Sequence, residues 1–154
     1  MTDSPYAIPF TGGWNVATYT STDMSVDWKT TSSPLTLFDV TGNVAVRVFG
    51  WSDAAITSTG GTGTIAVGCT GNTGHLLPAT TLNNTTAFPD AGYVWVDATP
   101  TTHIDVLPDT GNWHIISGGY DIIATIATAN VSAGQITLVC QWYPLTPGST
   151  VTVH

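Results

Sequence analysis

The charged residues of this 154-residue chain restrict its fold more than any other feature. All ten acidic residues are Asp, Glu is absent, and the only two basic side chains are Lys29 and Arg47, whereas Thr occurs 29 times. Glu, Lys and Arg cover the solvent face of most helices, and β-branched Thr suits a half-exposed strand. The sequence therefore predicts an all-β protein.

The same charge balance excludes several classes of function. With a net charge of −8 and two cations, the chain has little with which to neutralise phosphates, so we expect no nucleic-acid partner. No apolar run approaches the roughly 20 residues that span a bilayer, and no cationic and apolar leader precedes the first predicted strand. We therefore expect a soluble product, made in the cytoplasm and not bound to a membrane.

Two cysteines, Cys69 and Cys140, are present. They can form a disulfide if their Cα atoms lie within about 7 Å, which the sequence does not decide. In a cytoplasmic product two buried, reduced thiols are the favoured interpretation.

The chain is predicted to comprise an extended N-terminal arm at residues 1–13, one domain at 14–145 and a C-terminal tail at 146–154. The arm places Tyr6, Ile8 and Phe10 among Pro5 and Pro9, a composition that favours an extended segment over a packed strand. Two hypotheses follow: the arm packs against its own domain, or it contacts a neighbouring subunit.

Short apolar runs alternate with turn clusters along the domain, at the spacing of a sandwich or barrel. The predicted strands are 14–19, 25–28, 35–40, 44–49, 64–69, 93–96, 103–107, 113–116, 121–127 and 135–143. The segments 58–63 and 71–84 are predicted to be long polar loops. This strand count favours an antiparallel β-sandwich of the jelly-roll type, with an immunoglobulin-like sandwich as the nearest alternative.

Catalytic motifs are lacking in the sequence. Most Asp residues occur in turn contexts, such as the one around Asp90, and no Gly-x-Ser-x-Gly element occurs. His103 and Asp105, with Asp97 upstream, form a conceivable three-ligand metal site, although polar side chains on β-hairpins explain them equally simply. We expect no enzymatic activity, no metal and no cofactor.

The aromatic residues allow two interpretations. Exposed rings such as Trp51 and Trp95 could stack on sugars, as in carbohydrate-binding sandwiches, whereas most large aromatic side chains pack in cores and interfaces. Charged residues make up 8% of the chain, far below the roughly one quarter that is usual. Charge is depleted where subunits meet, so the sequence favours burial of its surface in protein contacts and hence a homo-oligomer.

A family resemblance is carried by the last third of the chain. The segment Asp121-Ile-Ile-Ala-Thr-Ile126, followed by Thr128-Ala-Asn-Val-Ser-Ala-Gly-Gln-Ile-Thr-Leu-Val-Cys-Gln-Trp-Tyr-Pro-Leu145, resembles the C-terminal strand pair of small virion proteins of tailed bacteriophages. The resemblance implies a capsid decoration (cement) protein. Such a protein is a virion component on the capsid exterior, often a trimer of β-sandwiches, and its partner is the major capsid protein.

The expected mechanism is the bridging of major capsid subunits, which stabilises the head against the pressure of packaged DNA. The residues expected to make subunit or capsid contacts are Tyr6, Ile8, Phe10, Trp14, Trp142 and Tyr143, and the C-terminal tail is expected to contribute as well. The alternative function is a carbohydrate-binding tail or adhesin module that uses Trp51 and Trp95.

Overall fold

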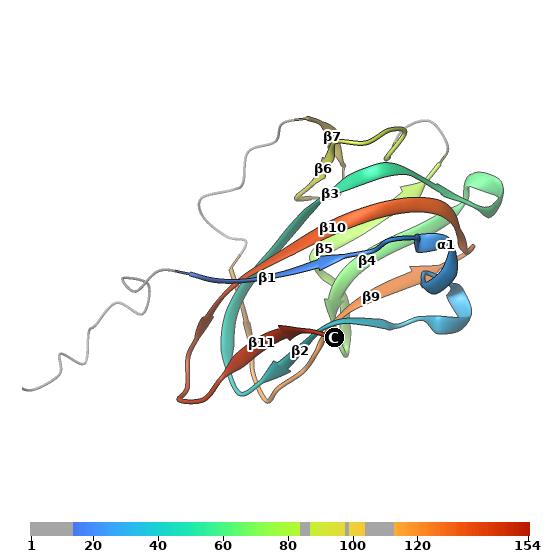
Figure 1. The fold of residues 1–154 in the computed structure, drawn as a ribbon. Helices are drawn as coiled ribbons and strands as arrows, with labels where there is room; N and C mark the ends of the chain where they lie inside the picture. The colour runs from blue at the N-terminus through green and yellow to red at the C-terminus, as the bar shows by residue number, and fades with distance from the viewer. Residues whose placement is uncertain (1–13, 84–86, 98, 104–112) are drawn as a thin grey trace, which may run out of the picture.

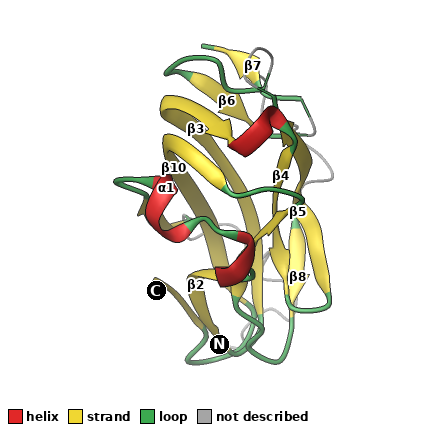
Figure 2. Ribbon diagram, turned by 90° about the vertical axis from the view of Figure 1, so that its right-hand side faces the viewer, coloured by secondary structure: helices red, strands yellow, loops and turns green. Residues whose placement is uncertain are grey.

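The computed structural model describes residues 14–83, 87–97, 99–103 and 113–154. Two antiparallel sheets pack face to face in these residues, so the protein is a β-sandwich (Figure 1). The predicted all-β class and the antiparallel sandwich are confirmed. Figure 2 shows the layers edge on, with β3 and β10 in one layer and β4 and β5 in the other.

The first sheet has the strand order β1-β10-β3-β6-β7, and β8 also pairs with β3. Its strands are β1 (Asn15–Thr20), β3 (Val44–Ser58), β6 (Tyr93–Trp95), β7 (Thr101–Thr102), β8 (His114–Ile116) and β10 (Val131–Pro144). The long strands β3 and β10 are paired along most of their length. They form the centre of this sheet.

The second sheet has the order β11-β2-β9-β4-β5. Its strands are β2 (Leu35–Thr41), β4 (Gly63–Cys69), β5 (Asn72–Leu82), β9 (Ile122–Ala127) and β11 (Thr150–Val153). Three short helices connect the strands: α1 (Met24–Asp27), η1 (Thr30–Ser32) and η2 (Thr59–Gly61). Of the described helices, none is long and apolar enough to cross a membrane.

The core lies between the sheets and follows from the alternation of side chains along each strand. Its largest fully buried side chains are Trp28, Trp95, Phe38, Phe88 and Met24. Leu138 of β10 faces Gly50 of β3 across the ladder. A Cβ atom at Gly50 would lie 2.6 Å from a Leu138 methyl group, so glycine is needed at this position.

Residues 25–28, predicted to be a strand, form helix α1 and its C-cap instead. The Asp23 side chain accepts a hydrogen bond of 2.8 Å from the backbone N–H of Ser25, and the N–H of Trp28 donates to the carbonyl of Met24. An Asp N-cap satisfies a backbone donor that would otherwise lack a partner at the start of the helix. Met24 and Trp28, four residues apart, are fully buried, whereas Val26 between them is 64% exposed, as one face of a helix and not of a strand predicts.

Residues 71–84, predicted to be a polar loop, contain the 11-residue strand β5. A tight turn at Thr70 and Gly71, where Gly71 has a φ of +86°, reverses the chain so that β5 pairs with β4. Leu77 and Leu82 of β5 are fully buried. Because most residues of this edge strand are polar, the sequence did not indicate that Leu77 and Leu82 belong to a strand.

The segment predicted to be a C-terminal tail belongs to the sandwich. Residues 150–153 form β11, which pairs with β2, and Val151 is buried in the core. Strands β3 and β10 also extend beyond their predicted bounds of 44–49 and 135–143. A short β7 is formed by residues 101–102, so the predicted strand 103–107 does not begin at His103, and its remainder lies outside the described residues.

Candidate functional site

The solvent-facing side of the first sheet is the candidate site. Residues directly opposite each other on paired strands share one face, and the core side chains Ala17, Val46 and Leu138 identify the inner face. The remaining residues define what we call the outer face: Val16, Thr18, Thr20, Ala45, Arg47, Phe49, Trp51, Asp53, Val94, Ile115, Thr137, Val139, Gln141 and Tyr143. Arg47 and Asp53 are its two charged side chains among the described residues.

Several apolar side chains on the outer face are strongly exposed. Ile115 is 72% exposed, Val16 58% and Trp51 36%. Solvent-facing positions of a sheet are usually polar. These exposed apolar side chains are the reason for taking this face as the candidate site.

An aromatic cluster forms one end of the outer face, and we define it as Trp14, Trp113, Tyr143 and Arg47. The rings of Trp14 and Trp113 are stacked, with centroids 3.9 Å apart and planes inclined by 18°. Tyr143 meets Trp14 edge on at 6.2 Å. These contacts join the residue preceding β1, the residue preceding β8 and the end of β10.

Arg47 is held in a defined orientation within the aromatic cluster. Its guanidinium carbon lies 5.1 Å from the centre of a Trp113 ring, and its Nε donates a 2.7 Å hydrogen bond to Oε1 of Gln141. The side chain is half-buried. An arginine held by a ring and an amide still presents its planar terminal amino groups as a fork that fits a carboxylate.

A polar network occupies the opposite end of the outer face. The indole Nε1 of Trp51 donates to one carboxylate oxygen of Asp53 at 3.0 Å, and the hydroxyl of Thr137 donates to the other at 2.6 Å. The hydroxyl of Thr137 also lies 3.2 Å from that of Thr20. Asp53 therefore orients an exposed tryptophan ring.

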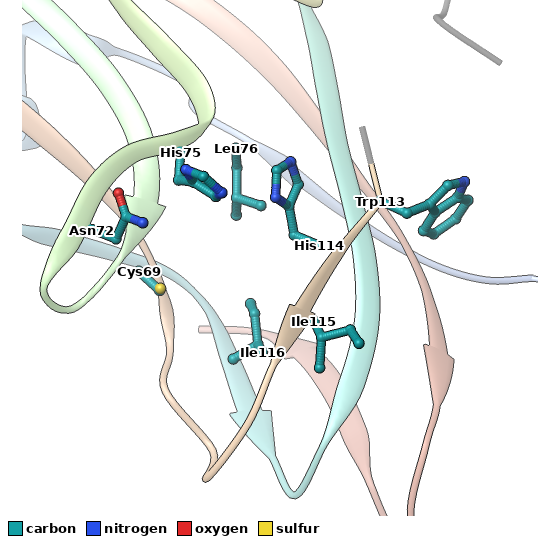
Figure 3. Close-up of a pocket in the computed structure, with 8 residues that line it drawn as sticks. All are labelled: Cys69, Asn72, His75, Leu76, Trp113, His114, Ile115 and Ile116. Atoms are coloured by element: carbon teal, nitrogen blue, oxygen red, sulfur yellow. The ribbon is translucent and has the colours of Figure 1, made fainter. Parts of the chain in front are cut away.

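A pocket of about 440 Å³ lies beside the outer face, between β8 and the β4–β5 hairpin (Figure 3). It is lined by Cys69, Asn72, His75, Leu76, Trp113, His114, Ile115 and Ile116. Figure 3 shows the rings of His75 and His114 pointing toward each other and Trp113 directed away from them. The two imidazole centroids are 4.5 Å apart.

Burial perturbs the pKa of His114, which lines the pocket, and of Cys140, which lies in the core. Desolvation, and secondly the nearby His75, lower the pKa of His114. Burial raises the pKa of the Cys140 thiol to about 12, so this thiol stays protonated and unreactive. Both cysteines are free, as expected, although Cys69 is half-exposed at the pocket instead of buried.

The structure separates the residues that the sequence grouped as contact candidates. Trp14 and Tyr143 lie in the aromatic cluster. Trp142 points the other way and packs, half-buried, against the core. Tyr6, Ile8 and Phe10 lie outside the described residues.

Trp51 and Trp95, grouped as sugar-stacking candidates, are also separated. Trp95 is fully buried and meets Phe88 edge on at 5.8 Å, so it is not accessible to a sugar and that assignment is wrong. It is paired with Gly50, on the inner face of the sheet. Trp51 keeps an exposed ring.

The conceivable metal ligands are not brought together in the described residues. The Asp97 side chain accepts a hydrogen bond from the backbone N–H of Thr99 at 2.8 Å, as in a turn. The His103 ring lies near Gly92, and Asp105 is outside the described residues. Within the part of the chain that the structure describes, no group of three or more His, Cys or Asp side chains is arranged to hold a metal ion.

Several members of the site were not singled out from the sequence. The alternation of residues in 44–49 does predict that Ala45, Arg47 and Phe49 lie on one side of a strand. This pattern is the part of the site that the sequence indicates. Nothing in the sequence indicates that β8 brings Trp113 and Ile115 alongside them, because that pairing joins residues about 70 positions apart.

Comparisons with known proteins do not add a family. No family model, curated protein or solved structure matches the chain.

Proposed function

We propose that the outer face of the first sheet binds other protein subunits, and that the chain is a non-enzymatic virion structural protein that stabilises a bacteriophage head. The single observation that carries the binding role is a broad solvent-facing sheet surface built from aromatic and aliphatic side chains with two charges. Such a surface matches the core of a protein interface, which is enriched in aromatic residues and arginine and depleted in lysine and acidic residues.

The energetic argument is that a partner removes this apolar surface from water. Val16 and Ile115, at opposite edges of the outer face, are both more than half exposed, and each buried methylene contributes about 0.8 kcal/mol. The aromatic cluster lies between them and offers rigid rings that lose little conformational entropy on binding. These features are those of a binding hot spot.

The assignment to a phage head rests on the resemblance of residues 121–145 to small virion proteins. The strand order supports a jelly-roll arrangement, since β1-β10-β3-β8 faces β2-β9-β4-β5 and the chain changes sheet between consecutive strands except within β4–β5 and β6–β8. This double-sheet architecture is common among viral capsid domains. We propose the major capsid protein as the partner and a homotrimer as the bound form.

Co-sedimentation with DNA-free expanded heads of the parent virus tests this function. We expect saturable binding of the wild-type chain and loss of binding in Ile115→Asp, whereas Thr152→Asp on the second sheet should bind normally. A wild-type protein that stays in the supernatant at all concentrations would refute the head-binding role.

A second candidate function, a carbohydrate-binding module, is favoured by the Trp51 and Asp53 pair. An exposed indole oriented by a carboxylate can stack on a sugar ring while the remaining acceptor capacity of Asp53 takes a hydroxyl. A glycan array tests this function: binding that is lost in Trp51→Ala and retained in Ile115→Asp would favour it over the head-binding role.

A further inference from the structure

We propose that the pocket between β8 and the β4–β5 hairpin binds a divalent transition-metal ion such as Zn²⁺ through the imidazoles of His75 and His114, with water in the remaining coordination positions. Imidazole is a preferred protein ligand of Zn²⁺, Cu²⁺ and Ni²⁺. The sequence pointed to His103, Asp105 and Asp97 instead, so this pair of histidines emerges from the tertiary structure alone. The inference does not depend on the proposed function.

A wide β-bulge in β5 carries the first histidine, His75. Between its paired residues Asn72 and Leu77, β5 places the four residues 73–76 opposite the single residue Gly68 of β4. A Cβ atom at Gly68 would overlap the carbonyl oxygen of Asn72, so this close approach of the two strands requires glycine. Bulges redirect side chains out of the regular alternation, and the exposed His75 ring on this bulge lines the pocket.

The short strand β8 supplies the second histidine from the other sheet. His114 pairs with Val46 of β3, a fully buried core residue, and residues directly opposite each other share one face. The half-buried His114 side chain therefore lies on the inner side of the first sheet, where Figure 3 shows it directed toward His75. An ion bound to both histidines would join the two sheets at this edge of the sandwich.

The separation of the two rings fits a shared metal ion. With Zn–N bonds of about 2.0–2.1 Å and a tetrahedral or square arrangement, the centres of two ligating imidazoles lie roughly 4.5 to 5 Å apart. The centroids of His75 and His114 are 4.5 Å apart, and their planes are inclined by 71°. Because His75 is exposed, its ring can turn to direct a nitrogen at the ion without disturbing the core.

The ring nitrogens are available to a ligand, and the charge of the chain favours a cation. Within the described residues, neither His75 nor His114 makes a hydrogen bond or an ion pair. A net charge of −8 raises the local concentration of cations. Cys69 lines the same pocket, but no group of three ligating side chains occurs in the described part of the chain. Water therefore completes the coordination, as at zinc sites that keep an open position.

Calorimetric titration of the full-length, EDTA-treated chain with ZnCl₂ tests the inference. We expect saturable binding of one Zn²⁺ per wild-type chain. His75→Asn and His114→Asn should each weaken it by at least about 10-fold, since even loss of a side chain that only supports a ligand costs 10-fold or more. Two controls should keep the wild-type affinity: His154→Asn, which removes the exposed imidazole beside Asp39, and Cys69→Ser. Excess MgCl₂ should not displace Zn²⁺, because Mg²⁺ prefers oxygen ligands.

Thermal melting gives a second measurement. Zn²⁺ should raise the melting temperature of the wild type and of His154→Asn more than that of the two pocket variants, because an ion that binds the folded state stabilises it. If circular dichroism finds His114→Asn unfolded, His75→Asn, changed at an exposed position, decides the test alone. The inference is overturned if the wild type does not bind Zn²⁺, if His75→Asn binds it equally well, if Mg²⁺ displaces it, or if Cys69→Ser abolishes binding.

Discussion

The two solvent-facing sides of the sandwich differ sharply in chemistry although one chain with one alternation pattern builds both. The outer face of the first sheet carries Trp51, Phe49 and Tyr143 along its rows. The corresponding side of the second sheet carries Asp39, Ile123, which is 5% exposed, and mostly small side chains: Thr36, Thr64, Ala66, Thr81, Thr125, Thr150 and Thr152. Threonine also occurs on the outer face of the first sheet, at Thr18, Thr20 and Thr137, but there it lies among large aromatic side chains.

The difference teaches that low charge has two separate causes in this protein. On the second sheet, threonine hydroxyls make the surface polar without formal charge. Asp39 and His154 form a pair at the edge of this sheet, with 2.8 Å between the carboxylate oxygen and Nδ1. On the first sheet, Arg47 and Asp53 lie among aromatic and aliphatic side chains. Under the proposed function, a partner subunit covers this apolar face.

The largest expected effect comes from a charge introduced on each face. Ile115→Asp should weaken binding to heads or to a second copy by at least 100-fold, roughly 3 kcal/mol, because an interface would bury an unpaired carboxylate. Thr152→Asp should leave binding unchanged. Co-sedimentation or light scattering measures the affinity, and thermal melting checks that both variants fold. Equal losses in the two variants would show that the faces do not differ in function.

Truncation of a ring gives the next largest effect. Trp113→Ala removes the ring that stacks on Trp14 and supports Arg47, so affinity should fall about 30-fold, as at a hot spot of 2 kcal/mol. The matched control is Tyr120→Ala, an aromatic that is 54% exposed and lies outside the outer face. A larger loss in Tyr120→Ala would move the binding surface to the loop before β9.

Removal of one hydroxyl tests the polar end of the outer face. Thr137→Val deletes the 2.6 Å hydrogen bond to Asp53, and the free energy of unfolding should fall by about 1.5 to 3 kcal/mol because the acceptor is charged and Thr137 is buried. Thr81→Val, exposed on the second sheet, should change it by less than about 0.5 kcal/mol. Urea denaturation measures both. Equal changes would mean that the network does not stabilise the fold.

The smallest expected effect is the response of His114 to acid. Its pKa is lowered in the folded protein by desolvation and by His75, so below the ordinary pKa of about 6.5 the unfolded chain takes up this proton more readily. Stability should be complete above pH 6.5 and should decrease as the pH falls toward the lowered folded-state pKa. The variant His114→Asn should lose less stability between pH 7 and 5 in thermal melts. An identical pH profile in both proteins would contradict the assignment.

Most of the fold could be predicted from local pattern, and the failures have a physical cause. Val44, Val46 and Val48 alternate along β3 so regularly that the strand is evident, whereas the polar start of β5 becomes a strand only through its ladder with β4. Residues 25–28 fold as a helix because Asp23 caps it, a local effect that outweighed alternation.

Less of the candidate site could be predicted. Trp51, Trp14 and Tyr143 were identifiable as aromatic candidates, but Trp95 has the same residue type and neighbourhood and is fully buried. The difference lies in the register of β3 and β6: Trp95 is paired with Gly50 on the inner face, whereas Trp51 is paired with Val94 on the outer face.

The sequence by itself determined that this protein is a β-sandwich, since a chain without Glu, with two cations and with many threonines lacks the side chains that solvate helices and favours pleated strands. The same composition leaves two cationic side chains for binding phosphates and no Glu for catalysis by carboxylates. The tertiary structure alone decided where the rings gather. Arg47, Trp113 and Trp14 come from segments far apart in the sequence, and their contacts exist because the pairing of β8 and β10 with β3, and of β1 with β10, brings these segments together.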